Sequence, residues 1–353
     1  MRPIKRRDFI KWLSLTPFVG GLSCVFDKGL NKAIFLGATK TDYGSDVVYL
    51  DQNEKIHFPL KLPFEVHSIE ISKDLMAFFP QKPHHQMAIT DQNFKNLKVL
   101  NCPDHYSFYG HGVIFKESGK ESFIYASTFN NIDGGILAIN TKTLDQKIFP
   151  SYGGSPHDMA IRGNQLIVLN SGETGGVRNI TTFECKKRSL KLLNKIAWPY
   201  DNINLMHFDL AFKKGHSNSF YIGLEGVDKQ NSHDLSIVSL DTRNQNFVPL
   251  SESLIARKMN SHCLSLVSSN DHRFLMATSP KGDCIVLFDN NKKKAAETIE
   301  IKKPLGVVFN NDNQSFYVTN HYGQVFRYDL RVKKLFQTRG TGVSFTSHLT
   351  TIN

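Results

Sequence analysis

The chain repeats one short pattern along most of its length: an apolar run typical of a β-strand, introduced by a histidine. The repeats return at intervals of roughly one propeller blade, about 40–45 residues. Six histidines stand at or just before the start of such a run, namely His67, His111, His157, His207, His262 and His348. A strand unit repeated at this spacing is typical of a radial array of small sheets, so the pattern predicts a β-propeller.

Short apolar runs separated by turn residues define the individual repeats. The second repeat has runs over 66–71, 75–80 and 86–90, the third over 112–115, 122–127 and 135–140, and the sixth over 262–267, 274–278 and 284–289. Amphipathic helical stretches longer than about ten residues are hard to find after the N-terminus. We therefore predict an all-β fold, a seven-bladed β-propeller that forms one domain over residues 31–353.

The two ends of this predicted domain complement each other. Residues 344–352 match the innermost strand of a blade but have no partner after them, while 33–38 and 46–51 match second and third strands without a first. Joining them completes one blade and removes the open sheet edges where the ring meets itself. We therefore expect the N- and C-terminal strands to share a blade.

Residues 1–30 have the features of a targeting segment. The run Arg6-Arg7-Asp8-Phe9-Ile10-Lys11 has the pattern of a twin-arginine signal, and an apolar stretch follows it. Proline and glycine interrupt that stretch, and crossing a bilayer needs about twenty apolar residues. We therefore expect export of a folded protein to the periplasm, with no transmembrane helix in the mature chain. Cys24 is an alternative point of lipid attachment, although Gly21-Leu22-Ser23 departs from the usual motif.

Charge and cysteine content narrow the classes of partner. The formal net charge of the chain is +11 at pH 7, and part of it lies in the basic leader. No nucleic-acid partner is expected, because an exported chain without interleaved aromatic and basic residues lacks that signature. The four cysteines outside the leader are predicted to be mostly buried free thiols, because no pair has a tight spacing: Cys102, Cys185, Cys263 and Cys284.

Motifs spread over nearly the whole chain resemble one known family. They are the Arg6-Arg7 leader, Gly110-His111-Gly112-Val113 followed by 123–127 and 135–140, Pro156-His157-Asp158 followed by 166–170, and Thr278-Ser279-Pro280-Lys281-Gly282. In these motifs the chain is similar to the twin-arginine-exported proteins of domain of unknown function 1513. The resemblance implies a seven-bladed, quinoprotein-like or YVTN-like propeller in the cell envelope, often encoded near imelysin-type and other iron-uptake proteins. It implies no established reaction.

The repeated histidines predict a binding site. If each run is the innermost strand of its blade, the six imidazoles reach one rim of the central channel. A site rich in imidazole and poor in carboxylate and thiolate suits iron or copper rather than calcium or magnesium. We therefore predict a transition metal ion, iron or copper, held by the histidine ring, with Asp158 as an outer acceptor of hydrogen bonds. The other interpretation is that the histidines are structural or solvated.

Two repeats depart from the pattern. In the seventh, Leu305 stands at the position that histidine has elsewhere, so that blade contributes no ligand. In the fifth, Phe208 occupies the matching position and His207 comes one residue earlier. Successive residues of a strand face opposite ways, so this shift could turn the His207 side chain away from the channel.

These observations favour a periplasmic propeller that binds a metal ion or metal chelate, in metal acquisition or handling. The alternative is a metal-free scaffold that docks a partner of an iron-uptake system. A metal-dependent enzyme of unknown reaction is the third candidate, and no catalytic residues are assigned. The sequence contains no nucleophile elbow, P-loop or haem-attachment motif.

Overall fold

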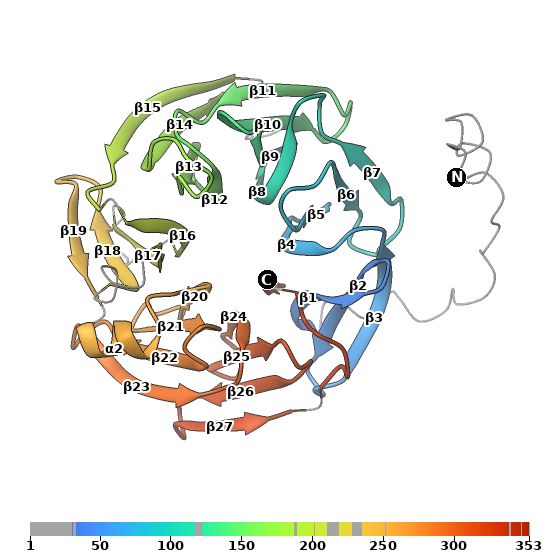
Figure 1. Ribbon diagram of the computed structural model, residues 1–353. Coiled ribbons are helices and arrows are strands. Elements are labelled where there is room, and N and C mark those ends of the chain that lie inside the picture. The colour runs from blue at the N-terminus through green and yellow to red at the C-terminus, as the bar shows by residue number, and fades with distance from the viewer. Residues whose placement is uncertain are drawn as a thin grey trace, which may run out of the picture.

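The protein is a ring of seven four-stranded antiparallel sheets (Figure 1), and residues of their innermost strands line a central channel. The computed structural model describes residues 30, 33–116, 122–186, 189–200, 202–209, 219–227, 235–250, 252–338, 340–346 and 348–352. Within these residues the predicted all-β, seven-bladed propeller is confirmed. The expected targeting segment lies almost wholly outside the described residues, as does Cys24.

The blades follow one another along the chain, each beginning at the channel except the first. Blade 1 contains, from the inside, β28 (Thr350–Thr351), β1 (Ala33–Thr41), β2 (Gly44–Asp51) and β3 (Ile56–Leu62). Blade 2 contains β4 (Val66–Ile71), β5 (Met76–Pro80), β6 (Gln86–Thr90) and β7 (Lys98–Asn101). Blade 3 contains β8 (Ser107–Lys116), β9 (Ser122–Phe129), β10 (Gly134–Asn140) and β11 (Gln146–Pro150). Blade 4 contains β12 (Pro156–Arg162), β13 (Gln165–Asn170), β14 (Asn179–Lys186) and β15 (Ser189–Ala197).

The remaining blades have the same order. Blade 5 contains β16 (Ile203–Asp209), β17 (Ser219–Gly226), β18 (Ile237–Asp241) and β19 (Asn246–Pro249). Blade 6 contains β20 (Ser265–Ser268), β21 (Phe274–Ser279), β22 (Cys284–Asp289) and β23 (Lys294–Glu300). Blade 7 contains β24 (Pro304–Asn310), β25 (Ser315–Asn320), β26 (Val325–Asp329) and β27 (Lys334–Gln337). The short helix α2 (Ser253–Lys258), which the sequence analysis did not anticipate, connects blades 5 and 6.

The C-terminal segment closes the ring as expected, although as a shorter strand than predicted. β28 pairs with β1 only at Thr350 and Thr351, and Ser344 accepts a 2.8 Å hydrogen bond from the amide of Lys40 nearer the other end of β1. The amide of His348 instead donates to the carbonyl of His67 in blade 2, at 3.2 Å. The closing segment therefore contacts two blades and carries its histidine into the channel.

The core lies between the faces of neighbouring blades. Phe79 of blade 2 packs in one buried cluster with Phe108, Ile124 and Leu137 of blade 3. Each such aromatic side chain contributes about 1.5–3 kcal/mol to stability when it leaves water. The outermost strands are more exposed, as β15 illustrates, because they have no neighbour beyond them. The apolar runs of the sequence therefore become inner strands.

The four cysteines in the described part of the chain, Cys102, Cys185, Cys263 and Cys284, are buried and free, as predicted. Burial raises the pKa of each of their thiols, for example that of Cys185 to about 11. They are therefore protonated at neutral pH and act as core residues. In the same described residues there is no helix with the length and hydrophobicity to span a bilayer.

Candidate metal centre

Bulges in the innermost strands aim the histidines into the channel. The pairing of β4 with β5 shifts register around His67, that of β12 with β13 around His157, and that of β16 with β17 just before His207. A bulge adds one unpaired residue and re-aims the side chains beside it. This allows His157 and Asp158, which are adjacent in sequence, to reach the same cluster.

Gly110 makes the corresponding bulge in β8 possible. Its φ is +100°, which L side chains rarely adopt, and a Cβ at this position would lie 2.9 Å from Cδ2 of His67. Glycine therefore serves both the backbone turn and the close approach of blades 2 and 3. The backbone then delivers His111 directly beside His67.

Five imidazoles meet at this end of the channel, one from each of blades 1 to 5. The ring centroid of His111 lies 4.7 Å from that of His67, 5.2 Å from His157, 5.8 Å from His207 and 4.9 Å from His348. The rings of His207 and His348 stack with centroids 4.7 Å apart. His207 therefore joins the cluster despite its shifted position in the sequence, because the bulge before it restores the inward direction. We refer to these five residues as the imidazole cluster.

The closest contact in the imidazole cluster joins two ring nitrogens. Nε2 of His67 lies 3.0 Å from Nε2 of His111. On the far sides of the rings, Nδ1 of His67 lies 2.6 Å from Oε1 of Gln81, and Nδ1 of His111 lies 3.2 Å from Oδ1 of Asp158. Both oxygens accept hydrogen bonds, so each Nδ1 is placed to carry the proton of its ring. With both Nδ1 atoms protonated, the two Nε2 atoms face each other with lone pairs; with one ring in its other tautomer, the same contact is an N–H···N hydrogen bond.

Asp158 connects three blades beneath the imidazole cluster. Its Oδ1 accepts the amide of Met159 at 2.8 Å and its Oδ2 accepts the amide of Phe208 at 3.0 Å. Oδ2 also lies against Nδ1 of His207. One buried carboxylate therefore orients the rings of His111 and His207, the arrangement in which outer-shell carboxylates orient metal-binding histidines.

Two further imidazoles have ring nitrogens without hydrogen-bond partners. Among the described residues, neither nitrogen of His348 has such a partner, and nor does Nδ1 of His157. Both side chains are more than nine-tenths buried. A buried polar atom left unsatisfied costs about 1–3 kcal/mol. Ligation of a cation at these nitrogens would remove part of that cost.

Burial keeps four rings of the imidazole cluster neutral, those of His67, His111, His157 and His348. Loss of hydration, and to a smaller extent the positive charge of Lys82, lowers the pKa of His67 to about 3. The pKa values of His111, His157 and His348 lie well below the usual range, first through burial and then through neighbouring charges. Neutral imidazole is the form that binds a metal ion. These four rings are therefore in their ligating form at neutral pH.

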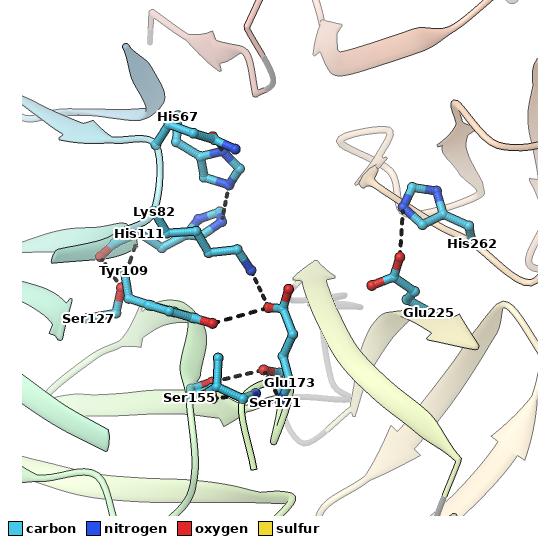
Figure 2. Close-up of polar contacts among 12 residues, drawn as sticks. His67, Lys82, Tyr109, His111, Ser127, Ser155, Ser171, Glu173, Glu225 and His262 are labelled. Carbon is cyan, nitrogen blue, oxygen red and sulfur yellow. Dashed lines mark hydrogen bonds and ion pairs between the residues drawn. The ribbon is translucent and has the colours of Figure 1, made fainter. Parts of the chain in front are cut away.

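The structure places His262 apart from the imidazole cluster. Its backbone bridges to Glu225 at the end of β17, and its Nε2 lies 3.8 Å from the Glu225 carboxylate, across the channel from His67 (Figure 2). Helix α2 and the positive φ values of Asn260 and Ser261, 50° and 47°, set this path. The structure therefore brings together five of the six histidines predicted to form the ring, and His262 is the exception.

The channel continues past the imidazole cluster as a cavity of about 370 Å³. Asp158, His207 and His348 line one end, and Glu70 of β4 lines the wall further along. Burial, and to a smaller extent the nearby charge of Asp158, raises the pKa of Glu70 to about 8. Glu70 was not predicted from the sequence, because a single glutamate inside an apolar run gives no signal of its own. The one signal for Glu70 is strand alternation, because it stands two residues after Ser68 and so shares the channel side of β4.

A Lys82–Glu173 ion pair lies at the mouth on the other side of the imidazole cluster (Figure 2). Lys82 follows β5, and Glu173 belongs to the glycine-rich segment between β13 and β14. Tyr109, which precedes His111 on β8, contacts both: its hydroxyl donates to Glu173 at 3.4 Å and its ring centroid lies 4.8 Å from Nζ of Lys82. Sequence reasoning missed Lys82, since only the fold brings it to this mouth.

Fold and site together define a seven-bladed β-propeller with a buried imidazole cluster in its channel. Residues 216–352 match the family described as "Protein of unknown function (DUF1513)". The match confirms the predicted family over this part of the chain, which runs from the second strand of blade 5 to the closing strand. A search of curated proteins finds no match to the chain.

Proposed function

We propose that the imidazole cluster binds a transition metal ion, iron or copper, and that the protein serves in metal acquisition or handling. The observation that carries this proposal is the 3.0 Å approach of the Nε2 atoms of His67 and His111 while each Nδ1 faces an oxygen acceptor. With both Nδ1 atoms protonated, the two Nε2 lone pairs face each other at this distance and repel. A cation between the two nitrogens would replace this repulsion by two metal–nitrogen bonds.

The distances suit a shared ion. A metal–imidazole bond is about 2.0–2.1 Å, so two ligand nitrogens at an angle of about 90–110° lie about 2.8–3.4 Å apart. His67, His111 and His348 each offer a ring nitrogen, and these three atoms lie within 4.8 Å of one another. Small rotations of the rings would bring all three to a single ion. The unpartnered nitrogens of His348 support its inclusion.

The donor set favours iron or copper over alkaline-earth ions. Calcium and magnesium prefer sites built from oxygen atoms, whereas imidazole suits later transition metals. Affinity among the divalent ions is greatest for copper, so a purified sample would retain copper even where the cell supplies iron. The ligand is a bare ion or a chelate that brings some of its own donors.

We further propose that the protein acts in the periplasm after twin-arginine export. This rests on Arg6-Arg7 and the residues after them, which precede the described structure. Export in the folded state fits a buried site, because a metal loaded in the cytoplasm would be carried across inside the propeller. Periplasmic fractionation of cells that carry an Arg6→Lys, Arg7→Lys variant tests the route, and unchanged export of that variant would exclude it.

Metal analysis tests the central proposal directly. Protein purified from its own periplasm, and apo-protein titrated anaerobically with Cu²⁺ and Fe²⁺, should each contain a stoichiometric metal ion. The variant H67A/H111A/H348A should bind none at micromolar concentrations. H262A is the matched control, because His262 is also buried at this mouth but pairs with Glu225 instead. Metal content that persists in the triple variant would refute the assignment.

A further inference from the structure

The Lys82 side chain places a positive charge next to the imidazole cluster. It is only 15% exposed, and its ammonium pairs with Glu173. That charge helps to lower the pKa of His67, His157 and His348, so it acts on three of the five rings. A cation bound at the cluster would therefore have a second positive charge nearby. The Lys82 charge therefore disfavours binding of a metal ion alone and favours binding of the ion together with an anion, which offsets the charge repulsion.

The Glu173 carboxylate already occupies the position of such an anion, next to the Lys82 ammonium. The carboxylate lies between the Lys82 ammonium and the Tyr109 hydroxyl, which donates to Oε2 at 3.4 Å. Tyr109 is 4% exposed, so its hydroxyl is fixed within the wall of the mouth. An external carboxylate in the same place would meet the same ammonium and the same hydroxyl.

The backbone on both sides of Glu173 is tied to the residues that lead into β12. The amide of Gly172 donates to the carbonyl of Gly154 at 2.8 Å, and the amide of Thr174 donates to the hydroxyl of Ser155 at 3.1 Å. Release of the carboxylate therefore requires only a rotation of the Glu173 side chain. Glu173 itself is one-third exposed. Its side chain can therefore leave the mouth without unfolding a blade.

We propose that Lys82 and Tyr109 form an anion subsite beside the metal centre, occupied by the Glu173 carboxylate until a carboxylate ligand of the metal displaces it. This inference rests on the proposed metal site and gives its ligand class: a metal ion whose free coordination position takes a carboxylate anion, as in a carboxylate chelate. Glu173 then acts as a latch that covers the imidazole cluster when the anion is absent.

The test is anion binding to Cu²⁺-loaded protein. Metal stoichiometry is measured first, then azide is titrated with its charge-transfer absorption as the readout, and formate is added as a competing carboxylate. K82M should weaken azide and formate binding by about tenfold, the effect of about 1.4 kcal/mol. E173Q should strengthen both severalfold, because the amide competes less well for the ammonium. K281M is the matched control, because Lys281 pairs with Glu225 at the same mouth, at 2.5 Å, away from the imidazole cluster.

The Cu²⁺ affinity of K82M is a second readout, and it should change in the opposite direction from the anion affinity. Removal of the Lys82 charge should strengthen Cu²⁺ binding severalfold while it weakens anion binding, a combination that simple loss of structure does not produce. If K82M and K281M bind azide like the wild type, the anion subsite is refuted while the metal site stands. If E173Q loses the metal, Glu173 is a ligand and the latch is refuted. If the wild type takes up no metal, the metal proposal fails, and the anion subsite fails with it.

Discussion

Asp158 provides the sharpest test of the site, because one carboxylate orients two rings of the imidazole cluster. Its two oxygens accept the amides of Met159 and Phe208 at 2.8 and 3.0 Å and lie against Nδ1 of His111 and of His207. In D158N the amide NH₂ must replace one of these oxygens. The NH₂ group then faces two other donors, one backbone N–H and one imidazole N–H. At least one of the two rings therefore loses its hydrogen-bond acceptor.

The expected loss follows from these contacts. Removing an outer-shell carboxylate costs about 10–100-fold in metal affinity, and we expect the upper end because Asp158 serves two rings. That corresponds to about 2.8 kcal/mol. The apo-protein should also lose about 1–3 kcal/mol of stability through the unsatisfied backbone amide. Competition against a chromophoric chelator measures the affinity, and urea unfolding of the apo-protein measures the stability.

Asp51 offers a matched control for this substitution. It also accepts two backbone amides, from Asn53 and Lys55, and pairs with a histidine, His57, at 2.8 Å, but it lies in the outer part of blade 1. D51N should leave metal affinity unchanged. If D158N binds metal as tightly as D51N does, Asp158 does not orient the ligands and the geometric reasoning is wrong.

Three further predictions concern stability. The pKa of His67 is lowered to about 3, so between about pH 6.5 and 3 the unfolded chain binds more protons than the folded one. The stability of the apo-protein should therefore decrease as the pH falls, by up to about 1.4 kcal/mol per pH unit for this group. An equal free energy of urea unfolding at pH 7.5 and 5.5 would contradict this. Deletion of residues 344–353 removes β28 and His348 and should unfold the propeller, whereas a melting transition like that of the full chain would show that closure is dispensable. G110A should displace His67 and weaken both stability and metal binding, while G163A, with φ of +60° and nothing within 4 Å of an added Cβ, should cost about 1 kcal/mol and leave the metal unaffected; equal effects of the two would exclude the contact with His67.

The sequence predicted the ring and its closure because both depend on local patterns. Apolar runs such as 66–71 and 284–289 are inner or middle strands in the structure, with the bounds that the pattern suggested. The unpartnered runs near the two termini indicated a shared blade, and β1 and β28 form it. Alternation and turn residues suffice for such predictions, since each blade is a local unit.

The direction of each histidine could not be predicted in the same way. A bulge changes which face a side chain occupies, and it leaves no clear mark in the pattern of apolar residues. His207 looked displaced in the sequence and joins the imidazole cluster, whereas His262 fitted the pattern and pairs with Glu225. Helix α2, which redirects His262, is too short to produce a helical periodicity.

By itself, the sequence determined the strand repeats, the circular closure and the supply of histidines to the channel, because these follow from spacing and from the burial of apolar faces. Only the tertiary structure decided which imidazoles meet, that Asp158 orients two of them, and that Lys82 and Glu173 lie over them. These contacts join different blades, and their geometry depends on register shifts and backbone turns of one residue. Such shifts alter few apolar contacts, so hydrophobic patterning does not encode them.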